Sequence, residues 1–192
     1  METHSIVWRR LDRPGHEAAR IEASGEGWRL AGTAVLAADA LPCRLDYSIE
    51  LDAGFVTRAV RVTGWIGTRA IDLAIAADGA GSWSLGGSPA PEVTGCLDID
   101  LGFSPSTNLL PIRRLGLAEG EEASVRAAWL PFPSLRLEPL EQRYRRIGPR
   151  RWRYESRDGA FVRELTVDRA GFPTLYPGLW QAEAAAPSGD PA

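Results

Sequence analysis

The residues best suited to chemistry are concentrated between residues 94 and 115. Asp98 and Asp100 alternate there with apolar residues, a pattern that predicts a short β-strand with both carboxylates on one face. The backbones of the two aspartates would lie roughly 7 Å apart. Two carboxylates at that spacing could hold a divalent cation or act as an acid/base pair on a sugar. Asp-x-Asp is a weak motif, so the pair alone establishes neither chemistry.

The same stretch supplies further polar side chains. Asn108 belongs to a predicted loop after the strand, and Arg113 and Arg114 follow it. Pro111 should hold Leu110 in an extended conformation. A simpler interpretation pairs the two aspartates with the two arginines across a hairpin. Exposed pairs of that kind would contribute only about 0–1 kcal/mol to stability.

Most of the chain has the pattern of β-strands. Strand signals recur about every 8–12 residues, separated by Gly, Pro and Asp. Residues 43–51 alternate most clearly, as expected of a half-buried antiparallel strand. No segment keeps a 3.6-residue apolar stripe beyond one or two turns, so helices should be few and short. We predict a single, mostly antiparallel all-β domain over residues 1–182, folded as a β-roll or incomplete barrel, and a disordered tail over residues 183–192.

Two segments of the chain resemble each other. Leu73–Gly81 and Arg163–Gly171 share an Asp, an Ala and a Gly in register. Two similar β-meander halves, joined by the stretch at 94–115, would explain the similarity. The alternative is that both are ordinary strand-turn-strand units with the same turn chemistry.

The bulk properties restrict the class of protein. The chain has 192 residues, of which 44% are hydrophobic and 24% charged, as in a single soluble domain. A formal net charge of −3 argues against general nucleic-acid or anionic-membrane binding. Neither a transmembrane run of ~20 apolar residues nor a signal peptide is visible, so we expect a cytoplasmic location. Cys43 and Cys96 are expected to be reduced, and we expect no metal and no cofactor.

The seven tryptophans are numerous for a chain of 192 residues and are spread over nearly all predicted strands. One interpretation is that they pack the core and close the ends of a barrel. The other is that aromatic rings line a cavity, where they stack on sugar rings or contact acyl chains while a few polar groups bind a head group.

The run from Gly95 to Leu115 resembles the signature of the bacterial putative glycolipid-binding family, formerly a domain of unknown function. Trp8 upstream, Gln142 downstream and the closing Tyr-Pro-Gly-Leu-Trp at 176–180 agree with that family. The resemblance extends from about residue 5 to residue 182. It implies a spiral β-roll and a soluble, non-catalytic protein that binds a glycolipid or a related amphiphile.

The resemblance also implies where the ligand would bind. The expected head-group site consists of Asp98, Asp100, Asn108, Arg113 and Arg114, and the expected cavity wall of Trp83, Tyr144, Tyr176 and Trp180. The alternative function is an enzyme acting on a sugar or lipid conjugate, with Asp98 and Asp100 as acid/base or metal ligands. A third hypothesis is a structural or protein-interaction domain in which the stretch at 94–115 is a clasp that holds the fold together.

Overall fold

The computed structural model of the chain describes residues 3–186, and its regular secondary structure is almost entirely β-strand. The first eight strands are β1 (His4–Arg10), β2 (Gly15–Ser24), β3 (Gly27–Ala38), β4 (Leu41–Leu51), β5 (Thr57–Ile66), β6 (Arg69–Ala77), β7 (Trp83–Leu85) and β8 (Ser88–Pro89). The others are β9 (Asp98–Leu101), β10 (Glu122–Leu130), β11 (Glu138–Gly148), β12 (Arg151–Ser156), β13 (Phe161–Val167), β14 (Pro173–Tyr176) and β15 (Trp180–Ala186). Three short helices occur, the 3-10 turns η1 (Pro91–Val93) and η2 (Ser106–Asn108) and the α-helix α1 (Leu109–Leu115).

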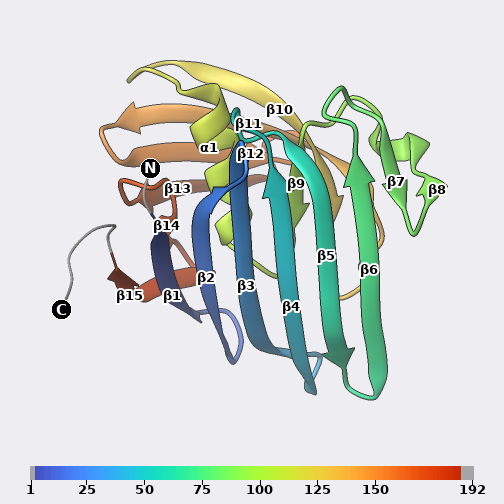
Figure 1. Cartoon of the computed structure of the whole chain (residues 1–192). Helices are drawn as coiled ribbons and strands as arrows, with labels where there is room; N and C mark the ends of the chain where they lie inside the picture. The colour runs from blue at the N-terminus through green and yellow to red at the C-terminus, as the bar shows by residue number, and fades with distance from the viewer. Residues whose placement is uncertain (1–2, 187–192) are drawn as a thin grey trace.

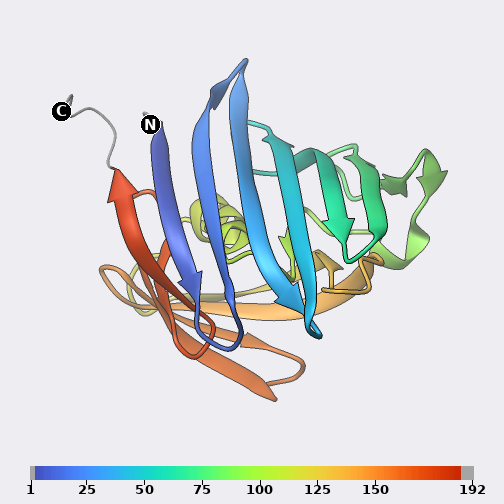
Figure 2. The same ribbon diagram turned by 90° about the horizontal axis from the view of Figure 1, so that it is seen from below.

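All strands belong to one sheet of two meanders. The order is β8-β7-β6-β5-β4-β3-β2-β1-β15-β14-β13-β12-β11-β10-β9, so the meander β1–β8 joins the meander β10–β15 through the pair β1–β15. Every pair is antiparallel except β9–β10, which is parallel. Figures 1 and 2 show that the sheet rolls over on itself, so that β1–β6 face β10–β13 with β9 and α1 between the two layers. The predicted all-β, mostly antiparallel roll is confirmed.

Alternation of apolar and polar residues builds the core between the two layers. On β4 the residues Cys43, Leu45, Tyr47, Ile49 and Leu51 are all buried, and the residues between them are not. The second meander presents its own buried residues to the same interior. Strand alternation therefore turns the apolar face of each layer toward the shared interior.

The similarity between Leu73–Gly81 and Arg163–Gly171 arises from a shared turn. Asp78 and Asp168 each accept two backbone N–H groups of their own turn on one carboxylate oxygen. Asp52 does the same in a third turn, outside both segments. Because the same motif occurs in this third turn, turn chemistry is sufficient to explain the resemblance between the segments.

The expected extended conformation of Leu110 is wrong, because Leu110 and Pro111 lie in α1. The helix follows directly on η2. Pro111 is the third residue of α1, where a backbone N–H would have no acceptor within the helix, so proline is tolerated there. Gly116 ends the helix in the left-handed conformation at φ 55°.

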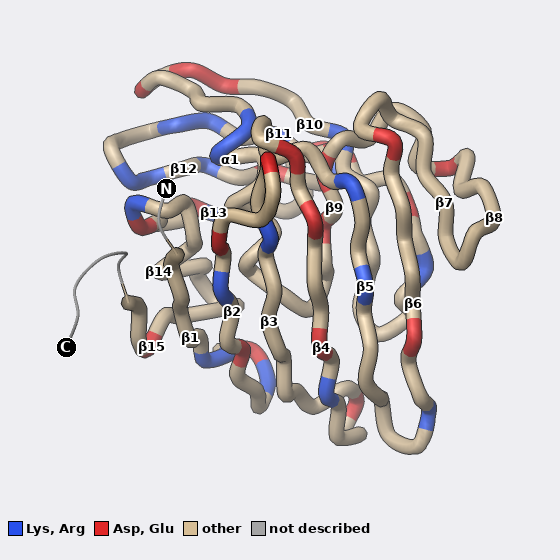
Figure 3. The backbone as a smooth tube through the Cα atoms, in the orientation of Figure 1, with Lys and Arg blue, Asp and Glu red and all other residues tan. Residues whose placement is uncertain are grey.

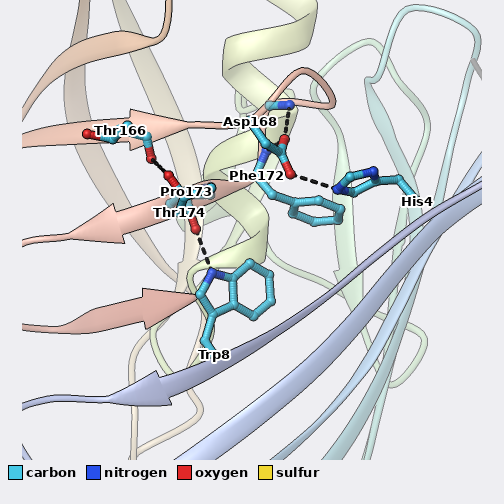
Figure 4. A network of polar contacts seen from close by, with 8 residues as sticks. His4, Trp8, Thr166, Asp168, Phe172, Pro173 and Thr174 are labelled. Carbon is cyan, nitrogen blue, oxygen red and sulfur yellow. Dashed lines mark hydrogen bonds and ion pairs between the residues drawn. The ribbon is translucent and has the colours of Figure 1, made fainter. Parts of the chain in front are cut away.

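Side-chain contacts secure the junction of the two meanders (Figure 4). His4 Nε2 lies 2.7 Å from Asp168 Oδ2, and the His4 ring stacks on Phe172 with centroids 5.6 Å apart. The indole N–H of Trp8 donates to the Pro173 carbonyl at 2.5 Å. Strand β1 is thereby held to β14 and to the turn before it, in addition to its pairing with β15.

The C-terminal boundary differs from the expected one. Residues 183–186 were expected in the tail but form the end of β15, because Ser5 of β1 pairs with Ala186. The rest of the expected tail, residues 187–192, lies outside the described residues. Within residues 3–186, none of the helices has the length and apolar character needed to cross a membrane.

Candidate functional site

The signature segment, which we define as residues 94–115, runs through the interior of the roll (Figures 1 and 2). Strand β9 pairs with β10 on one side, and the Ile99 N–H donates to Thr57 Oγ1 of the opposite layer at 3.1 Å. Thr107 Oγ1 accepts the Leu101 N–H at 3.2 Å and so ties η2 back to β9. Because both layers hold this segment, its polar side chains need partners inside the protein.

Asp98 is bound to Arg114 of α1. Arg114 Nε and Nη2 donate to Asp98 Oδ1 and Oδ2 at 2.9 and 2.5 Å, in a two-pronged ion pair. The Asp98 side chain is only 1% exposed, and that of Arg114 18%. Burial raises the pKa of the Asp98 carboxyl, and its bonds to Arg114 oppose that rise. The expected pairing across a hairpin is replaced by a pair between a strand and a helix.

Asp100 has a different neighbour. Gln142 Nε2 of β11 donates to Asp100 Oδ2 at 2.6 Å, and neither Arg113 nor Arg114 contacts this carboxylate within the described residues. Burial raises the pKa of Asp100 to about 6, and the hydrogen bond from Gln142 limits the rise. The two aspartates therefore have separate partners, one cationic and one neutral.

Asp100 lines a cavity of about 210 Å³ between the signature segment and the second meander, which we call the aromatic cavity. Its aromatic lining consists of Trp129, Tyr154, Phe161, Tyr176 and Trp180. Its polar lining consists of Asp100, Ser104, Asn108, Ser156 and Arg157. Leu101, Gly102, Leu140 and Leu179 complete the wall.

Packing fixes the aromatic wall from several strands. Tyr154 of β12 meets Tyr176 of β14 edge-on with ring centroids 6.1 Å apart, and Phe161 of β13 lies 6.0 Å from Tyr154. The guanidinium of Arg10 lies over the Trp180 ring at 5.1 Å. Since each of these four rings packs on a neighbour, the protein itself fixes the shape of this part of the wall.

The polar groups of the cavity are also held in place. Asn108 Nδ2 donates to the Pro105 carbonyl at 3.1 Å, and Asn108 Oδ1 accepts the Tyr144 hydroxyl at 3.1 Å. Ser104 Oγ lies 2.6 Å from Glu17 Oε1 behind the wall. These contacts leave little freedom to the loop that carries the polar groups.

A buried carboxyl stands behind Ser104. Glu17 of β2 is 1% exposed, and its Oε1 accepts hydrogen bonds from Tyr47 and Ser104, both at 2.6 Å. Glu17 Oε2 has no hydrogen-bond partner within residues 3–186. Burial raises the pKa of Glu17 to about 8, although both hydroxyls lower it. The alternation of residues along β2 would have indicated that Glu17 is buried, because it shares the buried face of that strand with Ala19 and Ile21.

The structure brings together four of the nine side chains expected at the site. Asp100, Asn108, Tyr176 and Trp180 line the aromatic cavity. The five that do not line it are Asp98, Arg113, Arg114, Trp83 and Tyr144.

Three of these five have evident structural roles. The Arg113 guanidinium lies over the Phe55 ring at 5.2 Å. Trp83 Nε1 donates to the Cys96 carbonyl at 2.9 Å. Tyr144, which is 1% exposed, supports Asn108 from behind.

Sequence reasoning missed several residues of the aromatic cavity. Tyr154 and Ser156 both lie on the inner face of β12, and the alternation of residues along this strand could have indicated that they point inward. Arg157 lies in a hairpin turn, and nothing local in the sequence indicates that this turn meets the signature segment. Within residues 3–186, no three His, Cys, Asp or Glu side chains gather in a way that could hold a metal ion.

Comparison with known proteins gives two matches. The sequence model of a family described as "Putative glycolipid-binding" matches residues 5–182. The crystal structure of a DUF1089 family protein from Pseudomonas aeruginosa is similar to this one with a TM-score of 0.78 and 34% sequence identity. The match covers 86% of this chain and 91% of that chain. No curated protein matches the chain.

Proposed function

We propose that this chain, which belongs to the putative glycolipid-binding family, binds the sugar head group of a glycolipid or related amphiphile in the aromatic cavity and leaves it chemically unchanged. The family description supports the ligand class. The observation that carries the proposal is the cavity wall, which combines five aromatic rings with hydrogen-bonding groups.

Such a wall suits a sugar for two reasons. The C–H faces of a sugar ring pack well on the rings of Tyr176 and Trp180, which offer large apolar areas. Sugar hydroxyls both donate and accept, so they match the acceptor oxygens of Asp100 and the amide of Asn108. Apolar walls with a few well-placed polar groups are the usual composition of a small-molecule site.

The size of the cavity limits what part of an amphiphile it takes. Its volume of about 210 Å³ is below the roughly 300–1,000 Å³ of pockets that enclose drug-sized ligands. We therefore assign it to the head group alone. The acyl chain of the ligand would lie outside the aromatic cavity.

A binding titration of octyl β-glucoside, kept below its micelle concentration, tests the proposal. Wild-type protein should bind it, and Asp100→Asn should weaken the affinity about 10- to 100-fold, because a hydrogen bond to a charged group contributes about 1.5–3 kcal/mol. Asn keeps the shape of Asp and can still accept from Gln142, so the fold should persist. Calorimetry would measure both affinities.

Asp72→Asn is the matched control for that titration. Asp72 forms an exposed pair with Arg61 on the first meander, and neither residue lines the aromatic cavity. This variant should bind octyl β-glucoside as the wild type does. Equal affinity of wild type and Asp100→Asn would contradict the assigned cavity.

A second candidate function is catalysis on a sugar conjugate, and one observation favours it. Asp100 lines the cavity with a pKa raised to about 6, which suits a general acid near neutral pH. Its expected partner is not available, because Asp98 is committed to Arg114 and does not line the cavity. Hydrolysis of nitrophenyl glycosides that is lost in Asp100→Asn would support catalysis, whereas recovery of intact ligand supports binding.

A further inference from the structure

Arg157 occupies an unusual position at the rim of the aromatic cavity. It lies in the hairpin between β12 and β13, is exposed, and lines the cavity together with the half-buried Asp100. Its guanidinium lies over the Trp129 ring, 5.5 Å from the centroid. A contact with an aromatic face satisfies none of the guanidinium N–H donors, so they stay available to a ligand.

Arg157 has no acidic partner, unlike two arginines of the neighbouring strand β12. Arginine is abundant on β11 and β12 (Figure 3). Arg151 is bound to Glu164 and Arg153 to Glu155, both at 2.6 Å. Within residues 3–186, Arg157 forms no ion pair and donates no hydrogen bond, although the carboxylate of Asp158 is its neighbour in sequence.

The backbone at Arg157 is strained. Arg157 and Asp158 have φ values of 53° and 52°, in the left-handed region that glycine and asparagine tolerate and a long side chain does not favour. The hairpin is closed by bonds from Gly159 N–H to the Ser156 carbonyl and from Ala160 N–H to the Arg157 carbonyl. Neither bond requires an arginine side chain. Strain at a residue that lines a cavity points to a role for that side chain.

We infer that Arg157 is a specificity-determining residue and that the ligand of the aromatic cavity is an acidic sugar amphiphile, with a carboxylate or phosphate group on its head. A guanidinium fork binds the paired oxygens of either group with two parallel hydrogen bonds. Asp100 lies further inside and meets sugar hydroxyls, whereas Arg157 meets the anionic group at the rim. This inference rests on the proposed function and adds the charge of the ligand to it.

The test compares three octyl probes of different head groups. Octyl β-glucuronide carries a carboxylate on the sugar, octyl β-glucoside is its neutral counterpart, and octyl phosphate carries charge without a sugar. Wild-type protein should bind the glucuronide at least about tenfold more tightly than the glucoside, since an ionic hydrogen bond contributes that much. Octyl phosphate should bind more weakly than the glucuronide, because it has no sugar ring to pack on the aromatic wall or to bond with Asp100. Stronger binding of octyl phosphate would assign the site to a phosphate.

Arg157→Gln should reduce glucuronide affinity to that of the glucoside and leave glucoside affinity within about twofold. Arg157→Gly should do the same and should fold without difficulty, because glycine favours the φ of this position. Arg145→Gln is the control, since Arg145 is an exposed arginine of β11 that does not line the cavity. It should retain the preference for the glucuronide.

The outcomes separate this inference from the proposed function. Equal wild-type affinity for glucuronide and glucoside, or a preference that survives Arg157→Gln, overturns the role of Arg157. Binding of the glucoside that is lost in Asp100→Asn would then still support the head-group cavity. If no octyl probe binds the wild type, both the inference and the proposed function fail.

Discussion

Replacing Asp98 with asparagine is expected to lower the free energy of unfolding by about 3 kcal/mol. The change removes one charge of an ion pair in which Asp98 is 1% exposed, and it leaves the Arg114 guanidinium inside the roll without its counter-charge. Breaking such a pair from one side costs about 3–5 kcal/mol, and we take the low end because Arg114 retains some exposure. In a domain of this size the melting temperature should fall by roughly 6–12 °C. Thermal and urea unfolding would measure the loss.

Two further variants decide whether loss of the ion pair causes the lower stability of Asp98→Asn. The exposed pair of Arg61 and Asp72 should contribute less than about 1 kcal/mol, so Asp72→Asn should leave the melting temperature nearly unchanged. The double change Asp98→Leu with Arg114→Met leaves no unpaired charge and should recover much of the lost stability. An Asp98→Asn variant as stable as the wild type would show that this pair does not hold β9 to α1.

Replacing Glu17 with glutamine is expected to stabilise the protein increasingly as the pH rises. Glu17 keeps its proton up to a pKa of about 8 in the folded state, whereas an unfolded glutamate loses it near 4.5. The folded state therefore binds more protons between these values, and wild-type stability falls as the pH increases through that window. The pKa difference corresponds to at most about 5 kcal/mol. Glutamine cannot ionise and avoids this loss.

Urea unfolding of wild type and Glu17→Gln from pH 5 to pH 9 would measure the effect. The difference in unfolding free energy should be smallest at pH 5 and grow by several kcal/mol by pH 9. Glu50→Gln is the control, because the Glu50 side chain is about half exposed, at 47%, and the difference should stay within about 0.5 kcal/mol throughout. A constant difference between Glu17→Gln and wild type would show that the buried carboxyl does not titrate in this range.

The strands of this fold could be predicted because the residue pattern of each strand indicates it independently of the rest of the chain. Alternation on residues 43–51 identifies β4 and its buried face without reference to any other part of the chain. The position of α1 could not be predicted, because the local preference of the residue before Pro111 pointed to an extended conformation. Burial of Leu109, Leu110 and Ile112 between two layers outweighs that preference.

The candidate site was predicted in part, from the signature segment and from the closing residues 176–180, which supply Tyr176 and Trp180. Asp100 and Asn108 are close in sequence, and both line the aromatic cavity. Arg157 lines the aromatic cavity from the β12–β13 hairpin, and Glu17 of β2 contacts Ser104 of its wall. Only the closure of the roll brings these two residues to the cavity. The partner of Asp98 was likewise decided by packing, since Arg113 and Arg114 are adjacent and only one of them faces the carboxylate.

Native mass spectrometry of the protein purified from its own organism tests the central claim most directly, with solvent extraction to identify anything bound. We predict one amphiphile with a sugar head group per protein chain, and its loss from Asp100→Asn purified in the same way. Protein that carries no such molecule, and that acquires no adduct when incubated with octyl β-glucoside or octyl β-glucuronide, would contradict the assignment of the aromatic cavity to a glycolipid head group.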